Sequence, residues 1–479
     1  MLRRRRGRSD LAVLDAGRWD VWCARAAGPR WREEVPALLT TLREVLDTGP
    51  PHDRAAALDA LGRAPAQLLV LLDRQARRSP QPRRITVRQV PRTPPIPARP
   101  DPGLLLASFD ADGRIREAAV AGLAGCGGPL AAAALALRTV DWVPEVRNRA
   151  AAALLLRSAP DEVAAAVRIL LRLHGRSRAG GLLTAYRAAL ADPPHRRAVR
   201  ALAVDADPAA RRFGVELALD LGEYVKGDLL RAALYDHDQV CRKLCAQRLL
   251  EIDPEQAGRL LRARGAGVRE LAVAALPADV PATRLVVLLA DRARMVRAQA
   301  RWQLYQRGEP PAEVYRKQLR RAGRPPAPAR LLAGLAAGLG ECGDAADAPQ
   351  LARLLGDPHA IVRRAAARAL GRLAKPDELV RLLGGLATDP DSGVAREVFE
   401  ALTRVPDDVP AETLWIGRTR TEPAVRALAE RISRQARATT TAAAPAPAAK
   451  HPALKQQAVK QQPAAQQAAG YEQSGHRPR

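Results

Sequence analysis

Hydrophobic and polar positions recur in a fixed order along most of the chain. An Asp is followed five residues later by an apolar residue and then by an Arg, with apolar residues at helical spacing on either side. Successive Asp positions lie about 32 residues apart, or about twice that, which is typical of helical repeat arrays. The order is complete at Asp110/Ile115/Arg116, Asp141/Val146/Arg147, Asp205/Ala210/Arg211, Asp236/Cys241/Arg242, Asp291/Val296/Arg297 and Asp357/Val362/Arg363. The repeats therefore predict an all-α chain.

Incomplete copies fill most of the longer intervals. Asp389/Val394 has Ala395 in place of the Arg, and weaker copies occur at Val268/Arg269, Ala329/Arg330 and Val425/Arg426. A copy expected near Leu173 is not found. With these copies the chain holds roughly ten or eleven units, each with two apolar helical stretches. A single helical pair cannot bury its own apolar face, so we expect the units to stack.

This repeat resembles the HEAT-repeat family of α-solenoids, including the short bacterial form seen in bilin-lyase-like repeats. The resemblance covers about residues 104–433 and implies a solenoid of roughly ten stacked helical pairs. It also implies that the second helices line a concave face, and that the repeated Asp and Arg form a structural ladder between neighbouring units. Carried over to this chain, the ladder consists of Asp110, Arg116, Asp141, Arg147, Asp205, Arg211, Asp236, Arg242, Asp291, Arg297, Asp357 and Arg363. Ala395 interrupts it near the C-terminal end, where we expect less regular structure.

The segments outside the repeats differ in composition. Residues 10–78 have helical apolar spacing, and their three tryptophans, Trp19, Trp22 and Trp31, predict the core of a helical cap or, alternatively, a docking site. Residues 79–103 are proline-rich and predict an extended linker. Residues 1–9 are basic, and residues 434–479 are rich in Ala, Pro and Gln, so both ends are predicted to be disordered.

Charge and composition narrow the class of protein. The 479 residues include 77 Lys and Arg against 51 Asp and Glu, a net charge of +26, and only seven of the 77 are Lys. Such an Arg bias is explained either by codon usage or by selection for binding an acidic partner. Aromatic residues make up 3%, which argues against a β-rich fold. No apolar run reaches about 18 residues, and five cysteines form no paired framework, so we expect a cytoplasmic protein.

Motifs for catalysis are missing from the sequence. There is no phosphate-binding loop, zinc-protease motif or nucleophile elbow, so we assign no catalytic, cofactor or metal residues and do not expect an enzyme. His237, Cys241 and Cys245 are spaced four residues apart on one helix, which is compatible with metal ligation. In the repeat register, however, both cysteines take core positions, which favours buried thiols over metal ligands.

The exposed face of the second helices is the best candidate for binding. Helical spacing from each Asp predicts that it carries Arg212, Lys243, Arg301, Trp302, Tyr305, Arg364 and Arg368. Aromatic and cationic groups together suit a protein partner that is acidic or extended. The alternative is sequence-independent nucleic-acid binding through this face and the basic ends. A purely structural interpretation, with Trp302 packed under the next unit and the arginines solvated, is also open.

Overall fold

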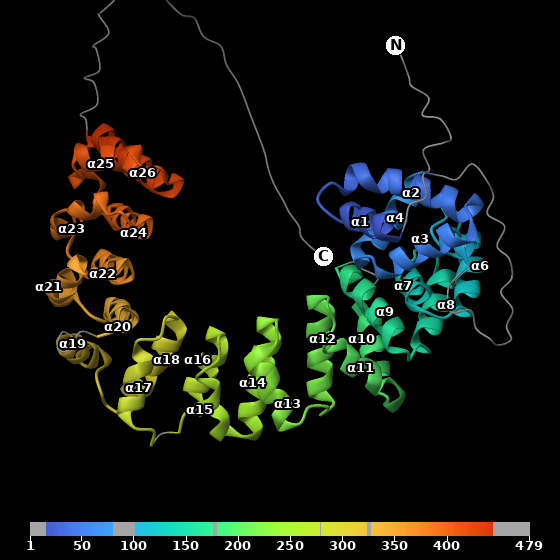
Figure 1. Cartoon of the computed structure of the whole chain (residues 1–479), viewed down its shortest axis with the longest axis horizontal. Helices are drawn as coiled ribbons and strands as arrows, with labels where there is room; N and C mark the ends of the chain where they lie inside the picture. Colours follow the sequence, from blue (N-terminus) through green and yellow to red (C-terminus); the bar gives the residue numbers. More distant parts are fainter. Residues whose placement is uncertain (1–15, 80–100, 176–179, 278, 323–326, 444–479) are drawn as a thin grey trace, which may run out of the picture. The chain divides into compact units, whose positions relative to one another are not determined.

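The computed structural model of the chain describes residues 16–79, 101–175, 180–277, 279–322 and 327–443. Within these ranges the protein consists of α-helices and short 3₁₀ turns, with no β-strand (Figure 1). It forms two compact units, which meet in the sequence at Gly343 and Asp344. The all-α prediction is confirmed.

Helices α5 to α26 alternate between a first and a second helix, which makes eleven pairs in the described residues. The first helices are α5 (Pro102–Ala107), α7 (Pro129–Arg138), α9 (Pro160–Leu173), α11 (Arg196–Leu202), α13 (Lys226–Tyr235), α15 (Ala257–Leu260), α17 (Ala282–Leu289), α19 (Pro311–Arg321), α21 (Ala348–Ala352), α23 (Pro376–Leu383) and α25 (Ala411–Thr419). The second helices are α6 (Gly113–Ala124), α8 (Pro144–Leu155), α10 (Gly180–Leu190), α12 (Pro208–Asp220), α14 (Gln239–Ile252), α16 (Ala266–Ala274), α18 (Arg294–Tyr305), α20 (Ala329–Cys342), α22 (Ala360–Leu373), α24 (Ser392–Leu402) and α26 (Pro423–Ala443).

Second helices pack on one another from repeat to repeat. In the first unit α12, α14, α16 and α18 follow each other in this way, and in the second unit α22, α24 and α26 do the same. Their inward residues are small or aliphatic, as at Val296, Ala300 and Leu304 of α18, which are fully buried. Each unit is thus a solenoid in which the apolar stripe of a helix is covered by the next repeat.

The repeated Asp shapes the turn before each second helix. The carboxylate of Asp291 accepts a hydrogen bond from the N–H of Ala293 at 2.8 Å, and α18 begins at the next residue. The helix cap is therefore two residues later than the Asp. In four turns that later position is itself an Asp whose carboxylate caps the helix, namely Asp112, Asp207, Asp238 and Asp391.

Gly371 lies inside α22 and does not end it. A Cβ atom at this position would come within 2.7 Å of the Cβ of Ala401 in α24, closer than two carbon atoms can approach. The glycine therefore permits α22 and α24 to pack closely, and the helix continues past it to Leu373.

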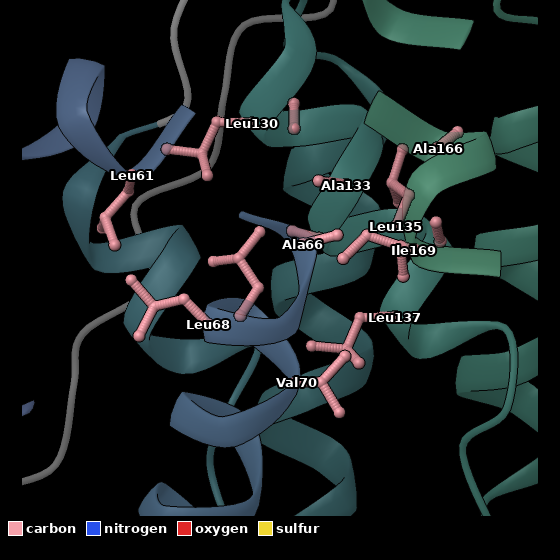
Figure 2. Close-up of a cluster of buried hydrophobic side chains, with 14 of the residues drawn as sticks. Leu61, Ala66, Leu68, Val70, Leu130, Ala133, Leu135, Leu137, Ala166 and Ile169 are labelled. Carbon is pink, nitrogen blue, oxygen red and sulfur yellow. The ribbon is translucent and has the colours of Figure 1, made fainter. Parts of the chain in front are cut away.

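Four helices precede the repeats and pack directly against them. They are α1 (Ala16–Ala26), α2 (Trp31–Thr48), α3 (Pro51–Arg63) and α4 (Ala66–Arg78). Figure 2 shows Leu68 and Val70 of α4 in one apolar cluster with Leu135 and Leu137 of α7 and with Ile169 of α9. The core of this segment is continuous with the core of the first repeats, so the segment belongs to the same compact unit.

The three N-terminal tryptophans have different surroundings. Trp19 is buried, with 1% of its surface exposed, and its ring stacks on that of Trp22 with centroids 6.0 Å apart. Trp22 and Trp31 are only partly buried, and the indole N–H of Trp22 donates to the carboxylate of Glu34 at 3.2 Å. The structure therefore gives Trp19 a packing role and leaves edges of the other two rings at the surface.

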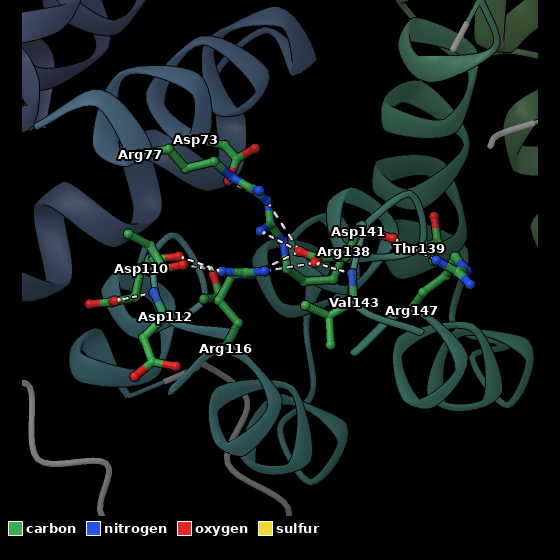
Figure 3. Close-up of polar contacts among 12 residues, drawn as sticks. Asp73, Arg77, Asp110, Asp112, Arg116, Arg138, Thr139, Asp141, Val143 and Arg147 are labelled. Atoms are coloured by element: carbon green, nitrogen blue, oxygen red, sulfur yellow. Dashed lines mark hydrogen bonds and ion pairs between the residues drawn. The ribbon is translucent and has the colours of Figure 1, made fainter. Parts of the chain in front are cut away.

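A buried network of ion pairs joins α4 to the first repeats (Figure 3). Arg138 of α7 has no exposed surface and contacts the carboxylates of Asp73 and Asp141. Arg116 of α6 holds Asp141 through two hydrogen bonds of 2.9 and 2.8 Å, and Arg77 of α4 reaches the same carboxylate at 3.2 Å. Breaking one member would leave charges buried without a partner, which makes this junction a strong constraint on the fold.

The network also shifts the ionisation of its members. Burial lowers the pKa of Arg138, although the carboxylate of Asp73 opposes this effect. Burial alone would raise the pKa of Asp141, but hydrogen bonds from Arg116 and from the Val143 N–H outweigh it and lower that pKa below its usual value. Asp141 therefore remains ionised between its cationic neighbours.

The boundaries of the flanking segments differ from those predicted at two places. Asp101 caps α5, which begins at Pro102, so the end of the proline-rich segment 79–103 is already helical. Helix α26 runs on to Ala443 rather than ending at 433, since its Ala and Arg residues favour helix. Residues 1–9, 80–100 and 444–479 lie outside the described residues.

No single helix in the described part of the chain is long and apolar enough to cross a membrane. Helices α3 and α4 pass the same criterion only as a pair, and they are bent by 116° at their junction.

Candidate partner-binding surface

The ladder arginines bind in two directions. Nη1 of Arg116 donates to the carbonyl oxygen of Asp110, six residues earlier, at 2.9 Å. Its Nε and Nη2 hold the two carboxylate oxygens of Asp141 in the next repeat. Arg363 repeats this arrangement with Asp389, at 2.8 and 2.9 Å. Each such guanidinium therefore closes its own turn and ties it to the following one.

The bond to the carbonyl six residues earlier is the constant part of the ladder. It is made by all the sequence-predicted arginines, Arg116, Arg147, Arg211, Arg242, Arg297 and Arg363. Two weaker copies, Arg269 and Arg426, make it as well. Arg330, by contrast, is the second residue of α20 and is exposed, so it belongs to no ladder turn.

The bond from a ladder arginine to a carboxylate of the next repeat varies more than the carbonyl bond within the turn. Arg211 reaches Asp236 at 3.3 Å and Arg269 holds Asp291 at 2.8 Å. The carboxylate of Asp205 is held from the first-helix side, by Arg168 of α9. The carboxylate of Asp357 accepts from the N–H of His359 at 2.8 Å.

Three ladder arginines lack an Asp in the repeat that follows. Arg297 uses Glu341, near the end of α20, as its acceptor instead. Arg147 and Arg242 reach no carboxylate among the described residues. The repeat that follows each of these two has no Asp at the ladder position.

The interruption at Ala395 is compensated from the next repeat. Arg420 occupies the Asp position of the last repeat, and its Nη1 donates to the carbonyl oxygens of Asp389 and Ala387 at 3.0 and 3.3 Å. A guanidinium thus still bonds the carbonyl oxygen of Asp389, but it comes from the following repeat and not from the helix that this turn precedes. The last turn is therefore tied to its neighbour by carbonyl contacts of an arginine that stands at the Asp position.

The arginines predicted for the binding face are mostly engaged by carboxylates of the following second helix. The pairs are Arg212–Asp238, Arg301–Glu341, Arg364–Glu397 and Arg368–Glu397. Only Lys243 is exposed without such a partner in the described residues. Glu341 and Glu397 do not occupy the repeated Asp position, so the sequence pattern does not mark them as partners of these arginines.

These pairs shift the ionisation of the acids. The hydrogen bond from Arg212 lowers the pKa of Asp238 to about 2. Burial alone would raise the pKa of Glu397, but the hydrogen bond from Arg368 outweighs it, and the pKa lies below its usual value. The predicted cationic stripe is thus largely neutralised within the protein.

The aromatic residues of the same face are free of such engagement. Trp302 and Tyr305 of α18 are 53% and 66% exposed, and their rings stack with centroids 6.0 Å apart. Met295, seven residues before Trp302 and so on the same side of the helix, is 54% exposed. We call Met295, Trp302 and Tyr305 the α18 patch. Its methionine was not foreseen, although its spacing from Trp302 was visible in the sequence.

Neighbouring groups hold the α18 patch in place. Arg301 directly precedes Trp302 in the sequence but turns inward to Glu341, at 2.7 Å. Tyr315 of α19 is fully buried, and its hydroxyl donates to the carbonyl oxygen of Leu289 at 2.9 Å. Burial raises the pKa of Tyr315, which keeps this hydroxyl a hydrogen-bond donor. Arg301 thus ties α18 to α20, and Tyr315 ties α19 to the end of α17.

The His and Cys residues of α14 and its preceding turn do not form a metal site in this arrangement. Cys241 and Cys245 have no exposed surface, and burial raises the pKa of each thiol to about 12. His237 is exposed. The described residues contain no group of three or more His, Cys, Asp or Glu placed to hold a metal ion. Buried, protonated thiols pack as small apolar groups.

An open cleft of about 420 Å³ lies between α9, α10 and α12. Phe213 forms part of its wall, with the guanidinium of Arg187 stacked 5.4 Å from the ring centroid. Arg187 is also paired with Asp220. The cleft occurs where the sequence shows no ladder copy, and its cations are already engaged.

Residues 313–403, from α19 to just past α24, match the family model for HEAT repeats. Within residues 313–403 the chain is therefore similar to HEAT repeats. Similar solved structures include one from work on tubulin recruitment and assembly by microtubule polymerases with TOG domain arrays, at 12% identity and a TM-score of 0.22, covering 71% of this chain and 87% of that one. Another is Kap121p, at 12% identity and a TM-score of 0.20, covering 86% of this chain and 45% of that one. Comparison with curated protein sequences finds no match.

Proposed function

We propose that this HEAT-repeat chain is a non-enzymatic scaffold that binds a protein partner on the face of its second helices, centred on the α18 patch. HEAT solenoids typically serve as protein-interaction scaffolds. The observation that carries the proposal is the exposed stack of Trp302 and Tyr305 beside Met295. Large aromatic groups on a rigid helix lose little entropy on binding and are enriched where interface energy concentrates.

The ion pairs of the same face favour protein over nucleic acid as the partner. A phosphate backbone would have to compete with Asp238, Glu341 and Glu397 for the arginines that they already hold. A protein partner instead gains energy by covering the aromatic rings and leaves those pairs intact. Sequence-independent nucleic-acid binding is therefore the weaker alternative for this face.

Paired variants of exposed aromatic residues test the proposal. The double variant Trp302→Ala, Tyr305→Ala removes the stack, and Trp415→Ala removes an exposed tryptophan, 64% accessible, from the other compact unit. Proteins captured from a lysate of the source cells by the wild type would be identified, purified and titrated against each variant. We expect the double variant to weaken binding about 30-fold, a loss typical of an interface hot spot, while Trp415→Ala binds normally.

Two results would contradict the proposal. Equal affinity of the double variant and the wild type would remove the α18 patch from the interface. Capture that disappears after nuclease treatment would assign the binding to nucleic acid, and affinity that falls steeply with salt would support the same conclusion.

A further inference from the structure

Arg242 has the posture of a ladder arginine but no carboxylate to hold. Its Nη1 donates to the carbonyl oxygen of Asp236, as in the other repeats. Its Nε and Nη2 lie over Gly265, 3.3 and 3.8 Å from the position of a Cβ atom built on that glycine. In Arg116 the same two nitrogens hold the carboxylate of the next repeat. The Nε atom of Arg242 is buried and has no hydrogen-bond partner.

The reason is one residue in the following turn. Ala263 stands at the ladder position, because its carbonyl accepts from Arg269, six residues later, at 2.8 Å. Where other repeats have an Asp, this turn has a methyl group. The N–H of Gly265 consequently lacks the side-chain acceptor that the equivalent N–H of Ala293 finds in Asp291. A guanidinium edge and a backbone N–H thus face the place that a carboxylate fills in the neighbouring repeat.

The surface around this place is positively charged. Arg262, Arg264, Arg292 and Arg294 are all exposed on the two turns before α16 and α18, and we call them the basic edge. Arg292 donates to the carbonyl oxygen of Arg264 at 2.9 Å, which links the two turns.

The aspartates of the turns before α14 and α18 are already engaged. Asp236 pairs with Arg211, Asp238 with Arg212 and Asp291 with Arg269. The basic edge therefore keeps its attraction for an external anion.

We propose that Arg242, the Gly265 N–H and the basic edge bind an acidic, extended peptide segment of a partner protein, with one Asp or Glu carboxylate seated on Arg242. The inference rests on the proposed function, since it takes the partner to be a protein. A carboxylate is the group that Nε and Nη2 hold in this posture at Arg116, Arg269 and Arg363. Because the Nε atom of Arg242 is buried, a partner's carboxylate would approach this guanidinium from its Nη2 side.

Exposed apolar side chains beside the site fit a peptide as well. Tyr235, directly before the turn of α14, is 74% exposed, and Met295 at the start of α18 belongs to the α18 patch. A segment lying across the turns would contact both side chains while its acids face the arginines. The site would thus extend the α18 patch along the turns of three successive repeats.

A variant that supplies the missing carboxylate tests the proposal. Ala263→Asp would fill the place from within the chain, whereas Ala263→Asn has a similar size and no charge. The probe is a fluorescein-labelled octaglutamate peptide, titrated by anisotropy against the full chain. We expect Ala263→Asp and Arg242→Gln each to weaken binding about tenfold or more, and Ala263→Asn to weaken it far less. Arg197→Gln, at an exposed arginine elsewhere, is the control for net charge.

Thermal unfolding without any peptide tests the geometry by itself. Ala263→Asp should raise the melting temperature by roughly 2 °C relative to Ala263→Asn, because a new charge-assisted pair with Arg242 forms within the fold. No rise would overturn the carboxylate site whether or not a protein partner exists. Failure of the proposed function would instead appear in the Trp302 and Tyr305 variants, so the two can be distinguished.

Two outcomes of the titration would also overturn the inference. One is equal affinity of the wild type and Ala263→Asp for the peptide. The other is tighter, Arg242-dependent binding of a labelled single-stranded RNA of equal charge at the same ionic strength, which would assign the site to phosphate.

Discussion

Arg116 and Arg242 occupy the same position of their repeats, yet their surroundings differ. Arg116 is fully buried, and its carboxylate partner Asp141 is shared with Arg138. Arg242 makes the same bond to its own turn but lies over Gly265 of the next repeat, where Ala263 takes the place of the Asp. The turn geometry is alike in both, so a single residue in the neighbouring repeat decides whether the guanidinium is used for packing or is available to a ligand.

The comparison separates two parts of the ladder. The bond within a turn is present in all the complete repeats and in the incomplete repeats of Arg269 and Arg426. The bond between turns adds stability where a carboxylate is present. Where that carboxylate is missing the fold persists, because apolar packing between second helices supplies most of the stability.

The largest expected loss of stability is at the fully buried pair of Arg116 and Asp141. Asp141→Ala leaves Arg116 and Arg138 buried without their shared carboxylate, and we expect a loss of about 3–5 kcal/mol in the free energy of unfolding. Asp236→Ala, at a more open pair with Arg211, should cost about 1 kcal/mol. Urea denaturation followed by circular dichroism measures both. Equal losses would show that burial does not distinguish the two sites.

A smaller loss of stability is expected when Arg269 or Arg242, the ladder arginines of two successive repeats, is replaced. Arg269→Gln removes two hydrogen bonds to Asp291 as well as the carbonyl contacts, and should cost about 2 kcal/mol. Arg242→Gln removes only carbonyl contacts and should cost about 1 kcal/mol. Melting temperatures of the two variants and the wild type give the order, and a larger loss at Arg242 would contradict it.

The smallest expected effect is a change in how the melting temperature depends on pH. Burial alone would raise the pKa of Asp291, but hydrogen bonds from Arg269 and the Ala293 N–H lower it below its usual value. A carboxyl whose pKa is lower in the folded state contributes its full stability above its unfolded pKa of about 3.9. That contribution is lost as the pH falls through the folded value. Melting temperatures between pH 6 and pH 3 should therefore fall less in Asp291→Asn than in the wild type, and parallel declines would argue against the pair.

Much of the architecture could be predicted from the repeat. In the structure the six-residue interval from Asp to Arg is spanned by the carbonyl bonds of Arg116 and Arg363. The sequence alone could indicate this contact because it is local and depends only on the turn. The Asp by itself does not fix the helix start, because an Asp can bond the N–H two residues on as well as cap a helix.

The attachment of the N-terminal helices was not predictable from the local pattern. Asp73 and Arg138 lie 65 positions apart in the sequence, and nothing in the spacing of either residue marks it as a partner of the other. The candidate binding face shows the same limit. Trp302 and Tyr305 are exposed as their helical spacing indicated, while Arg301 was expected there too and turns inward to Glu341.

The sequence by itself determined the helical period, the turn before each second helix and the position of its arginine, since these depend on hydrogen bonds between residues close along the chain. Only the tertiary structure decided which carboxylate each arginine meets, because that depends on the register between stacked helices. At Arg368 the stacking supplies Glu397, and at Arg242 it supplies Gly265, in a turn that has Ala263 in place of the Asp. The contact with Glu397 neutralises the charge of Arg368, which the sequence suggested was free. Arg242, which the repeat suggested was paired, is left without a carboxylate.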